Sequence, residues 1–396
     1  MAPHSRRHVV SAPARPNLNL SMPVIALDVM SGDVGARECV PAALLALAAD
    51  PQLKLMLVGQ RDVVEGELAQ ARAAQRAAGG EGRGAGDLRA RLEVVDAAEV
   101  VTMTDSPREA IRRKKHSSMR IAVDLVHAGR ADAMVSSGNT GALTAISHFV
   151  LKCLPQVERA PIMSAVPNAT GFTHMLDLGA NVRATAIQLE QFAVMGAIVA
   201  RDVHGTASPR VGLLNIGEEE MKGHETIQEA HALLRVRAAA TREGDPAAFR
   251  YAGFVEGHDI FTGEVDVVVT DGFTGNVALK TMEGVAALIT QRMRAEFTAT
   301  AASKFAALVA RPVLKRVGAA LDPRRYNGAV MVGLNGVVVK SHGRSDRVAV
   351  ARAVSTAALA VDRGLLRHVA QALGAAHPAA GAGATEHHPI VPGAQA

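Results

Sequence analysis

The sequence lacks tryptophan, and aromatic residues make up only 3% of its 396 residues. A surface that stacks nucleic-acid bases needs exposed rings, so this scarcity argues against such a surface. Cysteine is almost as rare: Cys39 and Cys153 both lie in apolar, helix-like stretches, and there is no CxxC motif. These features exclude a disulfide scaffold and predict buried thiols in a reducing compartment. No run of about eighteen apolar residues occurs, so a membrane-spanning helix is not expected.

Several familiar catalytic signatures are also missing. The chain has no GxGxxG fingerprint for dinucleotides, and no Gly-Lys dipeptide, which the P-loop requires. The GxSxG motif of α/β-hydrolases and the HExxH motif of zinc proteases do not occur. The histidines outside the C-terminal tail show no metal-ligand spacing. We therefore expect no metal site and no cofactor.

Positive charge is confined to three segments. Residues 1–21 have three arginines and no acid, residues 108–120 have six basic side chains and one acid, and residues 292–326 have eight and two. The whole chain has a net charge of +5, so the remainder is acidic, at −9. The chain is thus a mildly acidic body with local basic segments, and the pattern does not predict a nucleic-acid partner.

Short apolar runs alternate with segments of helical period along the chain. This alternation predicts an α/β fold: a Rossmann-like, mostly parallel sheet with helices on both faces and ligands at the carboxyl ends of the strands. The expected strands are 24–28, 53–58, 92–95, 133–136, 162–166, 175–178, 211–216, 251–255, 265–270 and 330–339. The expected helices are 37–49, 106–128, 184–203, 219–237, 276–297 and 346–373.

Three stretches look like additions to this body. Residues 1–21 are rich in Arg, Pro, Ser and Asn without an apolar core, so we expect a disordered extension and leave open whether Met1 or Met22 is the start. Residues 78–86 are glycine-rich and predict a mobile loop, and residues 374–396 predict a disordered tail. The remaining 22–373 form one expected domain.

Two strand-to-helix turns have the composition of anion sites. SSGNTGA (136–142) and DGFTGN (271–276) combine small polar residues with glycine, which lets backbone N–H groups converge on an anion at a helix N-terminus. Such a turn can also be only a tight connection, but two in one chain favour a phosphate site. The candidate ligands are Ser137, Gly138, Asn139 and Thr140 in the first turn and Asp271, Gly272, Thr274 and Gly275 in the second.

Three further polar stretches follow predicted strands. LDLGAN contains Asp177 and Asn181, NIGEEEMKGHE contains Lys222, and SHGRSD contains His342. A lysine in such a loop is most often a solvated surface charge. From the residues alone, the chain is an α/β protein that binds an anionic, phosphate-bearing ligand and has no nucleotide signature.

Eight stretches, in chain order, resemble those of one family, the bacterial acyl-acyl carrier protein:phosphate acyltransferases (PlsX). They are IALDVMSGD (25–33), RRKKHSSM (112–119), VSSGNTGA (135–142), LDLGAN (176–181), QFAVMG (191–196), PRVGLLNIGEEEMKGHE (209–225), DVVVTDGFTGNVALK (266–280) and VVKSHGRSD (338–346). The resemblance runs from Pro23 to Leu373. It implies a homodimer whose fold is similar to phosphotransacetylases and to isocitrate or isopropylmalate dehydrogenases, with a protruding helical hairpin.

The resemblance also implies the reaction. Such proteins reversibly transfer a fatty acyl group from acyl carrier protein to inorganic phosphate, and the acyl phosphate feeds glycerol-3-phosphate acylation in phospholipid synthesis. Lys222 and Asn276 match the catalytic pair: Lys222 would offset the charge of phosphate, and Asn276 would bind the carbonyl oxygen. Asp28 and Asp33 are expected to fix loops. Two alternatives stand beside this reaction: a phosphotransacetylase acting on short-chain acyl-coenzyme A, and a non-enzymatic membrane scaffold for lipid synthesis.

Three positions depart from the family pattern. Ser31 replaces the usual Gly, His224 the usual Asn, and Arg183 an Asp that often follows the LDLGAN turn. Because Arg183 reverses a charge beside that turn, a ligand-binding role for the turn is the least supported of the implied roles.

Two basic segments have expected partners. Arg112, Arg113, Lys114 and Lys115 are suited to docking of the acidic acyl carrier protein, the alternative being a solvated helix end. The helical segment 298–325 is amphipathic and is expected to lie on an anionic membrane, where Pro312 would kink or divide it. Its predicted membrane contacts are Phe305, Leu308, Val309, Leu314, Lys315 and Arg316. The alternative is a dimer-contact hairpin. The resemblance implies a cytoplasmic protein held at the inner face of the membrane, near the downstream glycerol-3-phosphate acyltransferase.

Overall fold

The computed structural model describes residues 22–77, 90–242, 245, 247–320 and 322–374. The predicted N-terminal extension, the glycine-rich loop and all but the first residue of the predicted tail lie outside these residues. The strands are β1 (Val24–Asp28), β2 (Lys54–Gly59), β3 (Leu92–Asp96), β4 (Ala133–Ser136), β5 (Ile162–Pro167), β6 (Phe172–Leu176), β7 (Arg210–Leu214), β8 (Arg250–Val255), β9 (Val267–Val269), β10 (Ala329–Met331) and β11 (Val337–Lys340).

The described strands form one sheet of eleven strands with the order β3-β2-β1-β4-β11-β10-β5-β6-β9-β7-β8. The first five in this order are mutually parallel, and so are the last four. β10 is antiparallel to both of its neighbours, and β5 is antiparallel to β6. The two parallel halves therefore run in opposite directions, which decides where their carboxyl ends gather.

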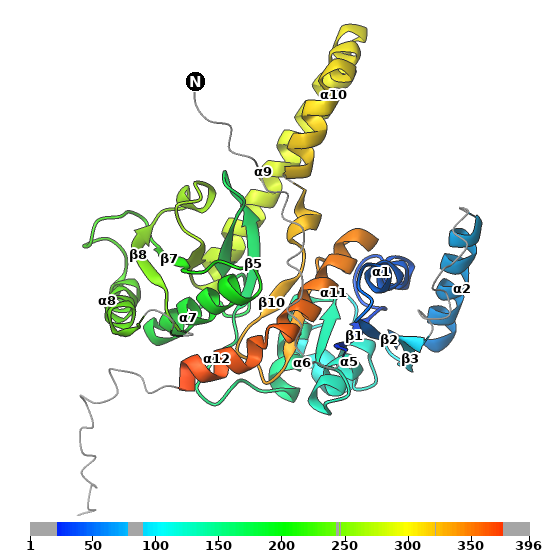
Figure 1. Ribbon diagram of the computed structural model, residues 1–396, viewed down its shortest axis with the longest axis horizontal. Helices are drawn as coiled ribbons and strands as arrows, with labels where there is room; N and C mark the ends of the chain where they lie inside the picture. The colour runs from blue at the N-terminus through cyan, green and yellow to red at the C-terminus, as the bar shows by residue number, and fades with distance from the viewer. Residues whose placement is uncertain (1–21, 78–89, 243–244, 246, 321, 375–396) are drawn as a thin grey trace, which may run out of the picture.

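Helices cover both faces of the sheet, as predicted (Figure 1). Alternate residues of a strand face opposite sides: Val337 and Val339 belong to one apolar cluster and Val338 to the other. The first cluster holds residues of α1, α7, α8, α11 and α12, and the second holds residues of α5, α6 and α9. The helices are α1 (Ala36–Ala49), α2 (Arg61–Ala77), α4 (Pro107–Arg113), α5 (Ser118–His127), α6 (Thr140–Val150), α7 (Ala186–Asp202), α8 (Glu225–Ala240), α9 (Gly272–Ala299), α10 (Ala301–Ala320), α11 (Arg347–Asp362) and α12 (Leu365–Gly374), with short 3-10 helices η1 (Asp259–Phe261) and η2 (Pro323–Tyr326).

Each predicted strand overlaps an observed one. The bounds agree within two residues except at β6, which begins three residues earlier than the predicted 175–178, and at 330–339, where one strand was expected. The chain turns back at Gly333, which has a φ of +92°, and β10 and β11 form an antiparallel pair. The available signal was the stretch GLNG (333–336), because an Asn-Gly pair between two apolar runs is typical of a hairpin turn. β10 and β5 are the two antiparallel strands that join the parallel halves of the sheet.

Four helix predictions are wrong in their bounds. The segment 106–128 is two helices because the Ser117 hydroxyl caps a second one, and 346–373 is divided at Gly364, with a φ of +65°. The predicted helix 219–237 begins only at Glu225, and 276–297 begins earlier, at Gly272. α2 was not predicted at all.

α9 and α10 form a long antiparallel hairpin that projects from the body, as Figure 1 shows in yellow. α10 runs on through Pro312, so the expected division of this segment does not occur. None of the helices in the described ranges is long and apolar enough to cross a membrane.

Candidate active site

Because the two halves of the sheet run in opposite directions, the predicted site residues gather in two clusters. Residues after β6, β9 and β7 form what we call the β9 cluster, and residues after β1, β4 and β11 form the β4 cluster. The turn 136–142 therefore belongs to one cluster and the turn 271–276 to the other. The two turns do not form a single cradle, and what connects the clusters is helix α9.

The β9 cluster is built on the N-terminus of α9. Asp271 is the N-cap, and its carboxylate accepts hydrogen bonds from the Thr274 N–H (2.8 Å) and hydroxyl (2.9 Å). The N–H of Gly272 donates to the carbonyl of Asn181 at 2.8 Å, so the two turns after β6 and β9 interlock. A helix N-terminus carries partial positive charge, which favours an anion beside this turn.

Asp177 and Asn181 are buried beside this turn and hydrogen-bond to the protein itself. Asp177 is fully buried, and its carboxylate accepts hydrogen bonds from the Ile162 N–H (2.9 Å) and from the Asn181 N–H (2.6 Å) and side-chain amide (2.9 Å). Burial raises the pKa of the Asp177 carboxyl, and these hydrogen bonds oppose the rise. The geometry gives both residues a positioning role in place of the substrate contact expected from the sequence.

Asn276 is exposed in the second turn of α9 and faces the turn after β6. A Cβ on Gly179, whose φ is +121°, would lie 3.5 Å from the Asn276 side chain. Within the described part of the chain the Asn276 amide makes no hydrogen bond. Its donor is therefore available for a carbonyl oxygen.

Lys222 lies in the loop after β7, the strand next to β9, so it belongs to the same edge as Asn276. Its ammonium is exposed and pairs with Glu219 at 3.0 Å, which lowers the pKa of the Glu219 carboxyl. Asn215 fixes this loop by donating to the carbonyls of Gly217 (3.1 Å) and Lys222 (3.0 Å). An exposed ion pair contributes little stability, so the Lys222 ammonium can exchange its carboxylate for a phosphate.

In the β4 cluster, side chains of the turn 136–142 are largely bonded to the protein itself. The Asn139 side chain caps α6 and also donates to the carbonyls of Met103 (2.8 Å) and Asp105 (3.1 Å). Ser137 is buried beside Cys39, and burial raises the pKa of that thiol to about 12. What this turn offers a ligand is therefore the backbone at the start of α6 and the exposed Thr140.

Asp28 and Asp33 fix loops, as expected from the sequence. Asp28 is fully buried and accepts hydrogen bonds from the Ser31 N–H (3.2 Å) and the Ser136 hydroxyl (2.7 Å). Asp33 pairs with Arg344 at 3.4 Å and so links the loops after β1 and β11.

His342 lies in the loop after β11, where its ring Nδ1 accepts the N–H of Arg344 at 3.2 Å. Partial desolvation lowers the pKa of the imidazole, and Glu283 opposes this effect. The positive charges of Lys280 and Lys340 lower it further. Glu283 and Lys280 belong to α9, so this helix reaches the β4 cluster one turn beyond Asn276.

Lys280 and Lys340 are not among the site residues predicted from the sequence. Lys280 follows Asn276 by four residues and therefore lies on the same face of α9. Lys340 ends the strand VVVK and is 9% exposed. Lys340 could have been predicted from the sequence, because it is a charged residue at the end of an apolar strand.

The predicted docking residues differ in their availability. Arg112, Arg113 and Lys115 are exposed near the end of α4, and Arg113 pairs with Glu109 at 3.6 Å. Lys114 is not available: its ammonium is bonded to the Asp105 carboxylate and to the Val100 carbonyl at 2.8 Å. The predicted role of Lys114 in docking is therefore wrong, because the lysine holds its own loop.

The exposed face of α10 is apolar. Phe305, Leu308 and Val309 are each more than 60% exposed, and Lys315 and Arg316 are also exposed. Leu314 is only half-exposed, and its spacing from Ala307 and Ala310 places it on the face that packs against α9. Leu314 is therefore not part of the surface predicted to contact a membrane.

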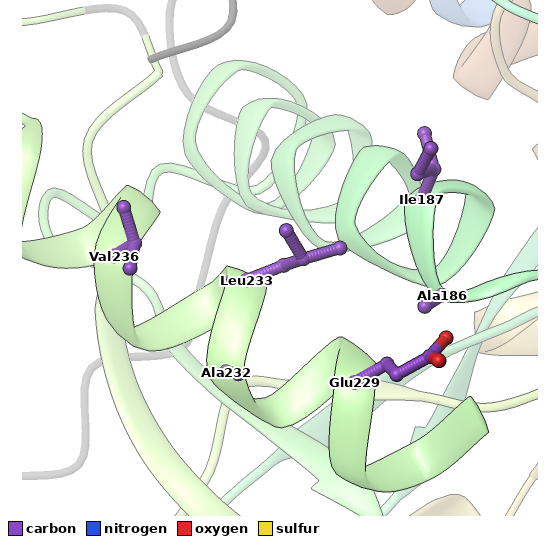
Figure 2. A pocket seen from close by; sticks show the side chains of 6 residues that line it. All are labelled: Ala186, Ile187, Glu229, Ala232, Leu233 and Val236. Carbon is purple, nitrogen blue, oxygen red and sulfur yellow. The ribbon is translucent and has the colours of Figure 1, made fainter. Parts of the chain in front are cut away.

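A groove of about 390 Å³ between α7 and α8 is a poor anion site (Figure 2). It is lined by Ala186, Ile187, Glu229, Ala232, Leu233 and Val236. Its lining is apolar apart from the Glu229 carboxylate, which repels anions. The phosphate chemistry must therefore be sought in the two clusters at the strand ends.

Comparison with known proteins agrees with this architecture. The chain is 49% identical over 349 residues to a phosphate acyltransferase from Alkalilimnicola ehrlichii, covering 88% of this chain and 95% of that protein. It is 49% identical over 350 residues to a phosphate acyltransferase from Methylococcus capsulatus, covering 88% of this chain and 96% of that protein.

Among solved structures, a phosphotransacetylase from Streptococcus pyogenes matches with a TM-score of 0.55 and 16% identity over 86% of this chain and 94% of that one. The EutD phosphotransacetylase from Staphylococcus aureus matches with a TM-score of 0.51 and 15% identity over 86% and 94%. These likenesses confirm the predicted fold type. The family profile described as "Fatty acid synthesis protein" matches residues 23–368. The chain therefore belongs to the PlsX family of phosphate acyltransferases and is an acyltransferase.

Proposed function

We propose that this protein transfers a fatty acyl group from acyl carrier protein to inorganic phosphate and so supplies acyl phosphate for glycerol-3-phosphate acylation. The observation that carries the proposal is the Asn276 amide, which makes no hydrogen bond within the described residues and stands at the N-terminus of α9 with Lys222 on the loop of the neighbouring strand. The family's curated members are named phosphate acyltransferases, which supports phosphate as the acceptor.

The reaction needs no acyl-enzyme, because phosphate is itself the nucleophile. A phosphate oxygen attacks the thioester carbonyl carbon, the carbonyl oxygen becomes an oxyanion, and collapse breaks the C–S bond and releases the thiolate. The thiolate takes a proton from solvent, and the products are acyl phosphate and a free thiol. Asn276 donates to the oxyanion, and one such donor is typically worth about 2.7–4 kcal/mol of transition-state stabilisation. Lys222 offsets the repulsion between phosphate and the developing oxyanion.

The test is phosphate-dependent thiol release from palmitoyl-acyl carrier protein, compared with acetyl-coenzyme A. Lys222→Ala and Asn276→Ala should each lower kcat by at least about tenfold while remaining folded. The matched control is Lys54→Ala, since Lys54 is an exposed lysine of β2 at the other end of the sheet. Wild-type turnover in both variants contradicts the assignment. Release without phosphate indicates a thioesterase, and a preference for acetyl-coenzyme A indicates a phosphotransacetylase.

Acyl carrier protein docks, in this proposal, on the basic end of α4. The exposed Arg112, Arg113 and Lys115 offer positive charge, and α4 packs against α6, whose N-terminus belongs to the β4 cluster. Arg112→Glu with Lys115→Glu should raise KM for the acyl carrier protein substrate and weaken its dependence on salt. Lys54→Glu, which reverses the charge of one exposed lysine in the same direction, is the control. An unchanged KM in the double variant removes this surface from the proposal.

The hairpin of α9 and α10 places the enzyme at the membrane in this proposal. The exposed apolar side chains of α10, with Lys315 and Arg316 beside them, suit an anionic lipid surface. The enzyme would then release acyl phosphate where a membrane glycerol-3-phosphate acyltransferase can use it. Flotation with anionic vesicles should recover the protein, and Lys315→Glu with Arg316→Glu should abolish this recovery. If the protein does not float with the vesicles and the Phe305→Glu variant dissociates from a dimer to monomers, the hairpin is instead a contact between subunits.

A homodimer is the remaining part of the proposal. α9 exposes Val285, Leu288, Ile289 and Met293, a larger apolar set than a monomer usually leaves to water. Sedimentation equilibrium of the wild type should give twice the chain mass, and Leu288→Glu should give a monomer.

A further inference from the structure

The last residues of three neighbouring strands form a buried polar row in the β4 cluster. Asp28 of β1, Ser136 of β4 and Lys340 of β11 are in register. Each stands two residues after a strand residue of the second apolar cluster (Ala26, Met134 and Val338). Since side chains two residues apart in a strand point to the same side, the three share that side of the sheet. The Ser136 hydroxyl donates to Asp28 at 2.7 Å and accepts the N–H of Gly138 at 3.1 Å. The turn 136–142 and Lys340 therefore lie side by side at the same edge of the sheet.

Lys340 is a buried cation that makes no direct ion pair in the described part of the chain. Its side chain is 9% exposed and hydrogen-bonds the carbonyl of the next residue, Ser341. In the described part of the chain no carboxylate lies within 4.0 Å of its ammonium, whereas the buried Arg237 pairs with Glu190 at 3.5 Å. An unpaired ammonium removed from water is costly, and proteins retain one where an anion completes it.

Two further observations favour an anion beside Lys340. Ser31, in the loop after β1, is 1% exposed, and its hydroxyl has no hydrogen-bond partner among the described residues. It packs against the turn 136–142, since a Cβ on Gly138 would be 2.7 Å from the Ser31 Cβ. Burial lowers the pKa of Lys340, and the charge of Lys280 on α9 lowers it further, so Lys280 is close by. The charges of Asp28 and Asp33 oppose this decrease. Two ammonium groups and an unsatisfied hydroxyl therefore belong to the β4 cluster, and the carboxylates of Asp28 and Asp33 belong to it as well.

We propose that Lys340 and Lys280 bind the acceptor phosphate, with Ser31 as an additional donor. The proposal rests on the proposed function and divides it between the clusters: the β4 cluster holds the phosphate, and the β9 cluster binds the thioester carbonyl. Asn276 and Lys280 are one turn apart on the same face of α9, which places their Cβ atoms about 5–6 Å from each other. A phosphate held by Lys280 therefore lies next to the carbonyl that Asn276 binds.

The test uses the whole chain and inorganic phosphate. Lys340→Met removes the charge at nearly constant volume, Lys340→Arg restores the charge, and Lys54→Met is the control on an exposed lysine. We expect Lys340→Met to raise KM for phosphate roughly 10- to 100-fold at saturating palmitoyl-acyl carrier protein, with a smaller change in KM for the acyl substrate. Lys340→Arg should recover part of the loss, and Lys54→Met should show none. Lys280→Met, which changes an exposed residue, should show the same increase in KM if Lys340→Met does not fold.

A second readout does not depend on turnover. Phosphate, compared with chloride at equal ionic strength, should raise the melting temperature of the wild type and of Lys54→Met but not that of Lys340→Met. A wild-type KM and melting shift in Lys340→Met overturn the proposal, as does the absence of any shift in the wild type. A phosphate shift that Lys340→Met abolishes, in a protein that transfers no acyl group, supports this site and overturns the proposed function.

Discussion

Gly275→Ala tests whether the interlocked turns after β6 and β9 position the site. A Cβ on Gly275 would lie 1.9 Å from the carbonyl oxygen of Asp177, whereas ordinary contact begins at 3.4 Å. One turn must therefore move by about 1.5 Å, because the contact is with backbone and no side chain can rotate away. Overpacking of this kind costs about 1–3 kcal/mol or more, against a gain of about 1 kcal/mol from alanine in a helix. A shift of about 1 Å at a reacting centre also costs about 100-fold in rate.

The matched control for this variant is Gly284→Ala on the same helix. A Cβ on Gly284 meets nothing within 4 Å, so this variant should gain up to about 1 kcal/mol from helix propensity and keep its activity. Urea unfolding measures the stabilities, and phosphate-dependent thiol release measures kcat. Equal stability and equal kcat in the two alanine variants would refute the positioning role of these turns.

Two further predictions concern buried titratable groups. His204 packs its ring 4.4 Å from that of His174, and burial lowers the pKa of His204 to about 4. Between pH 6.5 and 4 this imidazole is protonated in the unfolded chain but stays neutral in the folded chain. The free energy of unfolding should therefore fall by about 2 kcal/mol from pH 7 to pH 5 through this group. His204→Phe should remove that part of the slope in urea titrations at the two pH values; an unchanged slope contradicts the burial argument. Asp177→Asn should lower stability by about 2–3 kcal/mol, because an amide cannot accept all the hydrogen bonds that converge on the carboxylate. The exposed Asp62→Asn is its control, and equal stability of the two variants in urea would show that the carboxylate is dispensable.

Much of the fold was predictable because strand and helix patterns are local. The strands 24–28 and 133–136 were predicted with the bounds observed for β1 and β4, since each is a short apolar run bounded by polar residues. The errors occur where a capping residue or a glycine ends an element inside a periodic stretch, as at Ser117 and Gly364. Such an ending depends on the backbone of a few residues, and apolar periodicity does not register it.

The candidate site was predictable as a set of motifs but not as an arrangement. Asp177 carried the signal of a polar residue at a strand end, yet it is buried beneath the turn it holds. Lys114 looked like the rest of a basic segment, yet it is bonded to Asp105. Composition assigns a charge to a residue, and only packing decides whether that charge faces solvent or the protein's own backbone.

The sequence by itself determined the fold class, the family and the turns that carry the chemistry. Strand period, glycine-rich turns and motif order each depend only on residues that are close together in the chain. Tertiary structure alone decided that the two phosphate-type turns lie in separate clusters. This follows from β10 and β5, two antiparallel strands that join parallel half-sheets running in opposite directions. The tertiary structure also decided that Asn276 and Lys280 of α9 lie near Lys340 of β11. The helix α9 starts in one cluster, and its next turns lie near the other, so it brings together residues that are far apart in the chain.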